Sequence, residues 1–363
     1  MKEIKINYIT TKIEKEISGR LRYEGEIRKR LKDVELNMIE YSPSKTSLKG
    51  IAFAARAINK LLHFPYQVKT KAKKGNITHI TSEDLAYLLN FTEFKRTIVS
   101  CHDLYNWIFC RNSPFWKLNI RGLKKADRII TVSNFSKSEI VKYLEYPEEK
   151  IRVINDAVDH SHYYLKRNKE ILKKYNLPEN EKIILYVGSE QPKHNLPFLV
   201  KSFYQLKKKM PRVKLLKIGN PQQTGARKKL LDLIKKLNLE KEVIFLGYVD
   251  EKKLPQWYNA ADLSVYPCLY GGFGLPPLEA MACGTPIITS DLTSLPEVVG
   301  DAGIMIDPYN QNEMTEAMYK LLTNNKLRKS LIQKGLVRTK MFNWEKSAKE
   351  TQMLYREVTT IDY

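Results

Sequence analysis

One stretch of the chain indicates the fold most clearly: Tyr266-Pro-Cys-Leu-Tyr-Gly-Gly-Phe-Gly-Leu-Pro-Pro-Leu-Glu279-Ala-Met-Ala-Cys-Gly-Thr-Pro286. A predicted strand ends at Tyr266, a glycine-rich turn follows, and Pro276 and Pro277 stand where a helix begins, a position that proline tolerates. Glycines let backbone N–H groups approach a ligand closely, and the N-terminus of a helix adds a partial positive charge that suits phosphate. Glu279 lies about one turn inside this helix, where its two carboxylate oxygens suit a pair of vicinal ribose hydroxyls. Such a turn also occurs where the chain only makes a tight corner, so the rest of the chain must show whether this segment binds a nucleotide.

The second half of the chain alternates between predicted strands and helices. Apolar residues recur between the strands at spacings of three and four, which predicts helices with one apolar stripe. One such stripe consists of Leu196, Leu199, Val200, Phe203 and Leu206. The alternation predicts a parallel sheet with helices on both faces. The predicted strands are residues 182–187, 213–218, 243–246, 263–266, 286–289 and 304–306.

The first half repeats this pattern less regularly. After its fifth predicted strand, Ser136-Lys-Ser-Glu139 has the sequence of a capping box and predicts the start of a helix that runs through Leu144. The predicted strands of this half are residues 4–9, 34–39, 77–80, 97–100, 128–132 and 152–154.

The chain is too long for one ordinary core, so two α/β domains are expected. Residues 164–180 are polar and contain a proline, which favours a domain boundary in this segment. We therefore expect a first domain over residues 1–165, a second over 166–343, and a C-terminal helix over 344–363 that packs back on the first. Ligands of open α/β sheets bind beyond the carboxyl ends of the strands, so we expect the site in a cleft between the domains.

The composition describes a well-folded globular protein with a large excess of positive charge. Of 363 residues, 43% are hydrophobic and 28% are charged, and 62 Lys and Arg against 40 Asp and Glu give a net charge of +22. Nucleic acid, an anionic membrane surface and phosphorylated small molecules are each consistent with this excess, as is the lysine-rich surface common in heat-adapted proteins. The net charge alone does not distinguish among these four explanations.

The cysteines and the N-terminus indicate the cellular compartment in which the protein is expected. Cys101, Cys110, Cys268 and Cys283 form no C-x-x-C pair, which argues against a zinc site or a disulfide scaffold and suits a reducing cytosol. The N-terminus is charged and alternating, which is typical of a strand and not of a signal peptide. No stretch reaches the ~18 uncharged apolar residues that a membrane span needs. We expect a cytoplasmic protein that is not integral to a membrane.

In the order of its motifs, the chain resembles the retaining glycosyltransferases of the GT-B fold, the family of glycogen synthases, sucrose synthases and many bacterial mannosyltransferases. The resemblance covers nearly the whole chain and implies two Rossmann-like domains that face each other across a cleft. It further implies that the first domain binds the acceptor and the second the nucleotide-sugar donor. The segments that carry it are Cys101-His-Asp-Leu104, Arg128-Ile-Ile-Thr-Val-Ser-Asn-Phe-Ser136, Asn155-Asp-Ala-Val-Asp159, Tyr186-Val-Gly-Ser-Glu-Gln-Pro-Lys-His-Asn195, Leu215-Leu-Lys-Ile-Gly219, Phe245-Leu-Gly-Tyr-Val249, Ala260-Ala-Asp-Leu263, the run 266–286 and Ser294-Leu-Pro-Glu-Val-Val-Gly-Asp-Ala302.

The resemblance assigns donor binding to the second domain. In the family, an Arg-Lys pair contacts the donor diphosphate; Lys193 keeps a cation there, whereas His194 replaces the lysine and can be neutral at pH 7. Fixed cations and backbone donors stabilise a diphosphate leaving group. Glu279 matches the second of the family's paired glutamates, which binds ribose. An ordinary exposed lysine and a helix-surface glutamate are the alternatives for Lys193 and Glu279. The expected donor-binding positions are Gly188, Lys193, His194, Gly219, Val249, Gly272, Phe273, Gly274, Leu275 and Glu279.

In the first domain, His102 matches the family's histidine near the reacting carbon of the sugar, and a buried structural histidine is the alternative. Asp103 is expected to orient His102 or to cap a turn. Gly19 resembles the family's glycine loop, which faces the donor phosphate and the acceptor. The candidate catalytic residues are thus His102, Lys193 and Glu279.

The resemblance implies transfer of a hexose from a nucleoside-diphosphate sugar to a hydroxyl of a glycan or lipid-linked acceptor, with retention of configuration. No Asp-x-Asp pair occurs in the sequence, so we expect neither a catalytic metal ion nor a cofactor besides the sugar nucleotide. The family's first paired glutamate is replaced by Gly271, which leaves open a catalytically impaired homologue that binds nucleotide or glycan as a partner subunit. A nucleic-acid binder rests on charge alone, and because no recognised nucleic-acid motif is present we expect no nucleic acid.

A predicted apolar helical stripe lies in the first half, beside a run of basic residues. The resemblance places a lipid-linked acceptor near this part of the first domain, so reversible binding to the anionic inner face of a membrane is one expectation. An amphipathic helix packed on its own sheet is the alternative. The stripe consists of Ile51, Ala54, Ala55, Ile58, Leu61 and Leu62, with Lys49, Arg56, Lys60, Lys69, Lys71, Lys73 and Lys74 around it.

Overall fold

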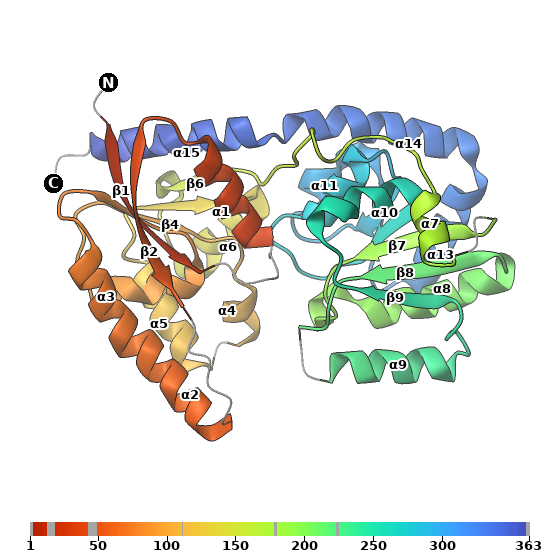
Figure 1. The fold of residues 1–363 in the computed structure, drawn as a ribbon, viewed down its shortest axis with the longest axis horizontal. Coiled ribbons are helices and arrows are strands. Elements are labelled where there is room, and N and C mark those ends of the chain that lie inside the picture. The colour runs from red at the N-terminus through yellow and green to blue at the C-terminus, as the bar shows by residue number, and fades with distance from the viewer. Residues whose placement is uncertain are drawn as a thin grey trace. The chain divides into compact units, whose positions relative to one another are not determined.

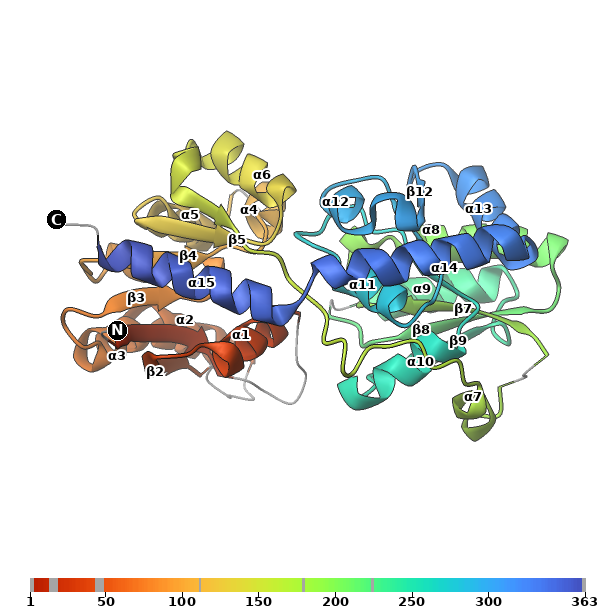
Figure 2. The same ribbon diagram turned by 90° about the horizontal axis from the view of Figure 1, so that it is seen from above.

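In the computed structural model, the chain forms two compact α/β units, each described here by itself (Figures 1 and 2). The structure describes residues 3–12, 19–42, 49–110, 112–177, 180–222 and 225–360, with the backbone only in residues 49–53. The first unit contains Met1–Asp156 and Trp344–Tyr363, and the second contains Ala157–Asn343.

The division after Asp156 falls earlier than the boundary expected at residue 165. The segment that follows Asp156 packs on the second unit. There the ring of Tyr163 lies 6.4 Å from that of Tyr258, and the Tyr164 carbonyl accepts the side-chain amide of Asn259. The polar residues between positions 164 and 177 therefore belong to a surface segment of the second unit.

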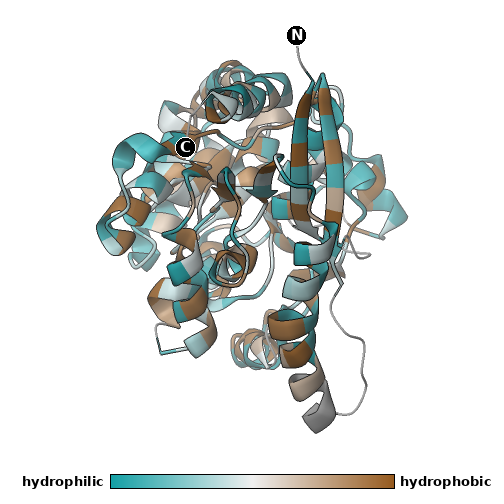
Figure 3. Ribbon diagram, turned by 90° about the vertical axis from the view of Figure 1, so that its left-hand side faces the viewer, coloured by the Kyte–Doolittle hydropathy of each residue, from teal (hydrophilic) through white to brown (hydrophobic). Residues whose placement is uncertain are grey.

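The first unit is built on a parallel sheet whose described strands follow the order β2–β1–β3–β4–β5–β6. Along β1 and β2, hydrophobic and hydrophilic residues alternate (Figure 3). Ile6 and Tyr8 pack with Tyr355 of the C-terminal helix, whereas Ile9 packs with Phe64 in a separate cluster. Because side chains alternate along a strand, the two clusters lie on opposite faces of the sheet, as predicted.

The described strands of the first unit are β1 (Ile4–Thr11), β2 (Val34–Tyr41), β3 (Ile77–Ile80), β4 (Thr97–Ser100), β5 (Arg128–Thr131) and β6 (Ile151–Val153). The described helices are α1 (Gly19–Arg30), α2 (Lys49–Ile58), η1 (Asn59–His63), α3 (Phe64–Lys71), η2 (Glu83–Asn90), α4 (Tyr105–Phe109), α5 (Pro114–Leu123), α6 (Asn134–Leu144), η3 (Glu148–Lys150) and α15 (Trp344–Thr359).

One prediction in this unit is wrong. Helix α6 begins at Asn134, and its N-cap is Ser133, three residues before the predicted capping box. Ser133 has extended dihedral angles, and its hydroxyl accepts the backbone N–H of Ser136 at 3.0 Å. The N-cap therefore follows the end of β5 almost directly, and Ser136 already lies in the first turn.

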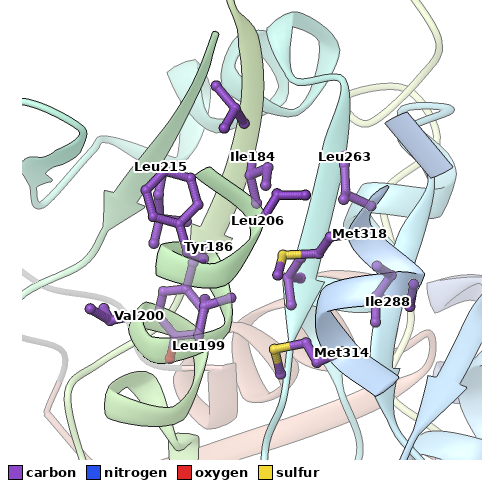
Figure 4. Close-up of a cluster of buried hydrophobic side chains, with 14 of the residues drawn as sticks. Ile184, Tyr186, Leu199, Val200, Leu206, Leu215, Leu263, Ile288, Met314 and Met318 are labelled. Atoms are coloured by element: carbon purple, nitrogen blue, oxygen red, sulfur yellow. The ribbon is translucent and has the colours of Figure 1, made fainter. Parts of the chain in front are cut away.

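The second unit is built on a parallel sheet whose described strands follow the order β12–β11–β10–β7–β8–β9. Its core brings together Ile184 and Tyr186 on β7, Leu215 on β8, and Met314 and Met318 on α13 (Figure 4). The predicted stripe of α8 is confirmed, because all of its members are buried in this core. Those members are Leu196, Leu199, Val200, Phe203 and Leu206.

The described strands of the second unit are β7 (Lys182–Val187), β8 (Val213–Ile218), β9 (Val243–Gly247), β10 (Leu263–Tyr266), β11 (Ile287–Ser290) and β12 (Ile304–Ile306). The described helices are α7 (Glu170–Lys174), η4 (Pro192–His194), α8 (Leu196–Lys209), α9 (Ala226–Lys236), η5 (Glu251–Lys253), α10 (Leu254–Ala260), α11 (Leu275–Ala282), α12 (Leu295–Val299), η6 (Gly300–Ala302), α13 (Gln311–Thr323), α14 (Asn325–Arg338) and η7 (Thr339–Met341). Within the residues that the structure describes, no helix is both long enough and apolar enough to cross a membrane.

Candidate functional site

Because the strands of the second sheet are parallel, their carboxyl ends meet at one edge. Gly188 follows β7, and its N–H donates to the carbonyl of Ile218 at 3.0 Å. Gly219 follows β8, and its N–H donates to the carbonyl of Gly247 at 2.7 Å. At Gly219 φ is +110°, and a Cβ there would lie 2.5 Å from the carbonyl oxygen of Gly188. Only glycine permits this close approach of the two loops.

At the same edge, the glycine-rich run after β10 leads into α11. Pro276 lies in the first turn of this helix, as predicted. At Gly274 φ is +129°, and a Cβ there would lie 2.8 Å from Leu295, so the turn requires glycine. The hydroxyl oxygen of Ser294 lies 2.6 Å from the carbonyl oxygen of Phe273 and 2.9 Å from that of Gly271. This serine therefore holds the glycine-rich loop in place.

The remaining positions expected in this region are more enclosed. Phe273 is 4% exposed, and its ring packs edge-on against Phe342 at 5.6 Å between centroids. Gly272 and Leu275 are buried, and Val249 is half-buried beyond the end of β9. The ring of Phe273 thus serves packing within the unit.

Lys193 lies in η4, on a loop that is bonded to the glycine-rich segment. Its carbonyl accepts the backbone N–H of Leu269 at 2.7 Å and the thiol of Cys268 at 3.2 Å. The hydroxyl of Ser290 in turn lies within hydrogen-bonding distance of the Cys268 carbonyl. The structure therefore brings the half-buried Lys193 beside the loop that precedes α11.

His194 is neutral at pH 7. Its Nδ1 lies 3.0 Å from the hydroxyl oxygen of Ser189 and 3.1 Å from the Ser189 carbonyl oxygen. Burial, together with the charges of Lys193 and Lys217, lowers the pKa of His194 to about 4, although the backbone hydrogen bond acts in the opposite direction. The position that carries lysine in the family therefore supplies no cation here.

Glu279 lies inside α11 and is only 2% exposed. Its Oε2 accepts the hydroxyl of Tyr258, on α10, at 2.8 Å. The alternative of a helix-surface glutamate is therefore wrong. The sequence does not indicate the contact with Tyr258, because it depends on how α10 packs against α11.

A buried ion network lies beside this edge and was not predicted. Lys217, on β8, is 2% exposed, and its ammonium lies 2.8 Å from the Oε1 of Glu190. The Nε of Arg227 donates to both carboxylate oxygens of Glu190, at 2.8 and 2.9 Å. Although burial raises the pKa of Glu190, the hydrogen bonds from Arg227 and Lys217 lower it below its usual range. A lysine in the otherwise apolar end of β8 is the only sequence signal for this network.

In the first unit, His102 follows β4 at the carboxyl edge of that sheet. Its ring packs edge-on against Tyr23, with 5.1 Å between centroids. Its Nε2 is buried without a hydrogen-bond partner among the residues that the structure describes. Burial, aided by the positive charge of Arg20, lowers the pKa of His102 to about 3, so the ring is neutral at pH 7.

The neighbours of His102 have distinct roles. Asp103 caps the turn into α4, because its Oδ1 accepts the backbone N–H of Tyr105 at 2.9 Å. Gly19 begins α1, and the loop before it lies outside the described residues.

Within the described ranges, no group of three or more His, Cys, Asp or Glu side chains is arranged to hold a metal ion.

Two family models match the chain in sequence. One, described as glycosyl transferases group 1, matches residues 167–338, and the other, described as glycosyltransferase family 4, matches residues 26–162. The chain belongs to the group 1 glycosyltransferase family. The edge that carries Gly188, Lys193 and Glu279 lies within the part that matches the group 1 model.

Relatives and solved structures extend this result. The O-antigen chain mannosyltransferase B of Escherichia coli is 35% identical over 239 residues, which cover 65% of this chain and 62% of the relative. The serotype-specific mannosyltransferase WbdA of Escherichia coli is 28% identical over 269 residues, 70% of this chain and 32% of the relative. The chain thus spans less than two thirds of the length of these relatives.

Two solved structures show the fold. The sucrose-phosphate synthase of Thermosynechococcus elongatus is similar with a TM-score of 0.79 at 20% identity, covering 98% of this chain and 99% of that chain. HepE of Anabaena, in complex with UDP and glucose, also has a TM-score of 0.79, at 15% identity over 98% of this chain and 100% of that chain. The two α/β units of this group 1 family member are therefore those of the GT-B fold.

Proposed function

We propose that the protein transfers a hexose from a nucleoside-diphosphate sugar to a hydroxyl of a glycan or lipid-linked acceptor, with retention at the anomeric carbon. The observation that carries the proposal is the arrangement at the carboxyl edge of the second sheet. There a glycine-rich loop, held by Ser294, leads into the N-terminus of α11, and the loop of Lys193 is bonded to it.

In this proposal, the diphosphate lies against the backbone N–H groups before α11, where the helix dipole favours negative charge. Lys193 supplies the cation for the leaving group, because His194 is neutral. Glu279 accepts hydrogen bonds from the ribose hydroxyls while Tyr258 holds its Oε2. His102 lies near the reacting carbon as a neutral hydrogen-bonding group. The relatives named as mannosyltransferases and the structure that contains UDP support this class of donor.

The test is turnover of sugar nucleotides by the full chain. Donors with uridine, guanosine, adenosine and deoxythymidine diphosphates are offered with neutral oligosaccharide acceptors, and the anomeric configuration of the product is read by NMR. Transfer from at least one donor with retention is expected. Inversion at the anomeric carbon contradicts the proposed stereochemistry, and a complete lack of both transfer and donor hydrolysis contradicts the transferase function.

A second candidate is a partner subunit that binds nucleotide or glycan without transferring sugar, and Gly271 favours it. In the family pattern this position carries the first paired glutamate, and glycine provides neither charge nor acceptor. Nucleotide binding in the absence of turnover with every donor would support this second function.

We further propose that the first unit binds an anionic membrane surface reversibly. Three large apolar side chains are exposed at spacings of four residues along the continuous helical segment α2–η1–α3. They are Ile58 (57% exposed), Leu62 (67%) and Tyr66 (67%). Such spacing places the three side chains in one stripe. Phe64 and Val68 of the same segment pack into the core of the unit. The predicted stripe is thus divided: Leu61 packs against the core, Ile58 and Leu62 are exposed, and the side chain of Ile51 lies outside the described residues.

Charge supports the same partner. Residues 41–82 contain eight Lys or Arg and no Asp or Glu. Each basic residue close to an anionic surface contributes about 1 kcal/mol to binding. We expect flotation with vesicles of anionic lipid at low salt, and its loss in Leu62→Asp but not in the matched control Val337→Asp, an exposed valine of the second unit. Equal recovery with neutral and anionic vesicles would refute the membrane proposal.

A further inference from the structure

The half-buried carboxyl group of Glu83 contacts the loop that carries His102. Strands β3 and β4 are parallel neighbours in the first sheet, so the segments after them leave the same edge. Glu83 begins η2 after β3, and His102 follows β4. The backbone N–H of His102 donates to the Oε2 of Glu83 at 3.2 Å. On the other side, the hydroxyl of Ser136 donates to the His102 carbonyl at 3.0 Å.

These backbone contacts set the position of the His102 ring. Its Nε2 has no hydrogen-bond partner among the described residues, and its ring rests against Tyr23. No side-chain hydrogen bond at Nε2 therefore fixes the imidazole. Its position depends on packing and on the two backbone anchors, of which Glu83 is the one that titrates.

Glu83 is surrounded by more negative than positive charge. Asp84 is its neighbour on η2, and Asp103 approaches from the loop after β4, where the thiol of Cys101 and the ring of His102 are neutral. The cation that faces Glu83 is Arg20, on α1. Its guanidinium donates to the Ser82 hydroxyl at 2.6 Å and to Asp84 at 2.9 Å.

The surroundings of Glu83 are also poorly hydrated. Glu83 and Asp103 line a cavity of about 10 Å³, together with Trp107 and Trp116. A cavity of this size holds one water molecule at most. Burial, followed by the charges of Asp84 and Asp103, raises the pKa of Glu83 to about 8, although Arg20 acts in the opposite direction.

We propose that Glu83 is a positioning residue for His102: its carboxyl oxygen accepts the His102 N–H and holds the loop that carries the ring, and ionisation of the carboxyl alters this contact. Ionisation makes the carboxylate a stronger acceptor, and it also adds a negative charge beside Asp84 and Asp103 that Arg20 opposes. The position of the His102 loop then depends on the charge of Glu83. The proposal rests on the proposed function, in which His102 lies near the reacting carbon.

The kinetic test compares Glu83→Gln, Glu83→Ala and the control Glu93→Gln, an exposed glutamate of the same unit. Glutamine keeps a neutral acceptor for the His102 N–H, whereas alanine removes it. We expect the wild-type kcat to change as the pH passes through about 8, Glu83→Gln to lack this change, and Glu93→Gln to keep it. Glu83→Ala is expected to lower kcat roughly tenfold or more at every pH with little change in KM for the donor. The same pH-dependent change of kcat in Glu83→Gln, or an unchanged kcat in Glu83→Ala, overturns the proposal.

A second readout does not depend on catalysis. Selective 15N labelling of the six histidines gives few amide resonances, and the His102 signal is assigned with His102→Gln. We expect the His102 amide to shift with a midpoint near pH 8 in the wild type and not in Glu83→Gln. A His102 amide that does not titrate between pH 6.5 and about 9 overturns the proposal. A titrating amide in a protein without turnover supports the role of Glu83 and instead refutes the transferase function.

Discussion

Replacement of Gly271 by glutamate restores the carboxylate that the family pattern places at this position, and the structure permits it. Gly271 does not have a positive φ, and a Cβ there would meet only the Sγ of Cys268, at 3.9 Å, which is an ordinary contact. The loop backbone is held by Ser294, so the new side chain extends from a fixed position. Replacing a glycine at a compatible position stabilises a protein by about 0.4–1 kcal/mol through the unfolded chain. We therefore expect Gly271→Glu to fold with an unchanged or slightly higher Tm.

The expected gain follows from one added hydrogen bond between a carboxylate and a sugar hydroxyl. Such a bond contributes about 1.5–3 kcal/mol, which corresponds to an increase of about ten- to hundredfold in kcat/KM for an ordinary hexose donor. The assay measures kcat/KM across ordinary, deoxy and amino sugar nucleotides for the wild type, Gly271→Glu and Gly271→Gln. Glutamine has nearly the same size without the charge, so it should give a smaller gain.

The values of kcat/KM across the donors test whether Gly271 lies beside the donor sugar. We expect the wild type to favour donors that lack or modify the hydroxyl in question, and Gly271→Glu to shift the preference toward ordinary hexoses. A folded Gly271→Glu that binds nucleotide normally but turns over ordinary hexose donors no faster than the wild type would show that Gly271 does not lie beside the donor sugar.

Three further predictions concern the second unit. Lys193→Ala and Glu279→Ala should each lower kcat/KM more than tenfold, because each loses a charge-assisted contact of about 1.5–3 kcal/mol, while the exposed control Lys201→Ala stays at wild-type activity; equal activity in all three would show that the donor binds elsewhere. Tyr258→Phe should destabilise the fold by about 1 kcal/mol in chemical denaturation and weaken nucleotide binding, since it removes the hydroxyl that donates a hydrogen bond to Glu279. Unchanged nucleotide binding would show that Glu279 serves packing alone. The pKa of His194 is about 4 in the folded state and near 6.5 in the unfolded chain, so the folded state binds the proton less well. The free energy of unfolding therefore falls as the pH drops from about 6.5 to 4, by up to about 1.4 kcal/mol per pH unit. His194→Gln should flatten that slope in thermal melts, and an unchanged slope would contradict the neutral state of this half-buried ring.

Most of the fold is predictable from the sequence because each strand is a short apolar run between turn residues. The predicted ranges of β3, β4, β7, β8, β10 and β12 match the structure, and β11 both begins and ends one residue later than predicted. Local patterns fail where two signals compete, as at α6, where both Ser133 and Ser136 suit an N-cap and only the end of β5 decides between them.

The candidate site is less predictable, because its residues meet through sheet order and helix packing. Strand ends locate Gly188, Gly219 and Lys193 along the chain, since ligands of parallel sheets bind at carboxyl ends. The contacts of Glu279 with Tyr258 and of Glu83 with His102 join segments 21 and 19 residues apart. No period or motif encodes such contacts, because they arise only when neighbouring elements pack. For the same reason, the neutral state of His194 follows from its burial beside Ser189 and not from its type.

Nucleotide binding by the full chain tests most directly whether the carboxyl edge of the second sheet is the donor site. Thermal shift is measured with UDP, GDP, ADP and dTDP for the wild type, Glu279→Gln, Lys193→Ala and the control Lys201→Ala. A ligand at a hundred times its Kd stabilises the folded state by about 2.7 kcal/mol. We predict that at least one nucleotide raises the Tm of the wild type and of Lys201→Ala, and raises it much less in the two site variants. No shift with any nucleotide, or an equal shift in all four proteins, would contradict this location of the donor site.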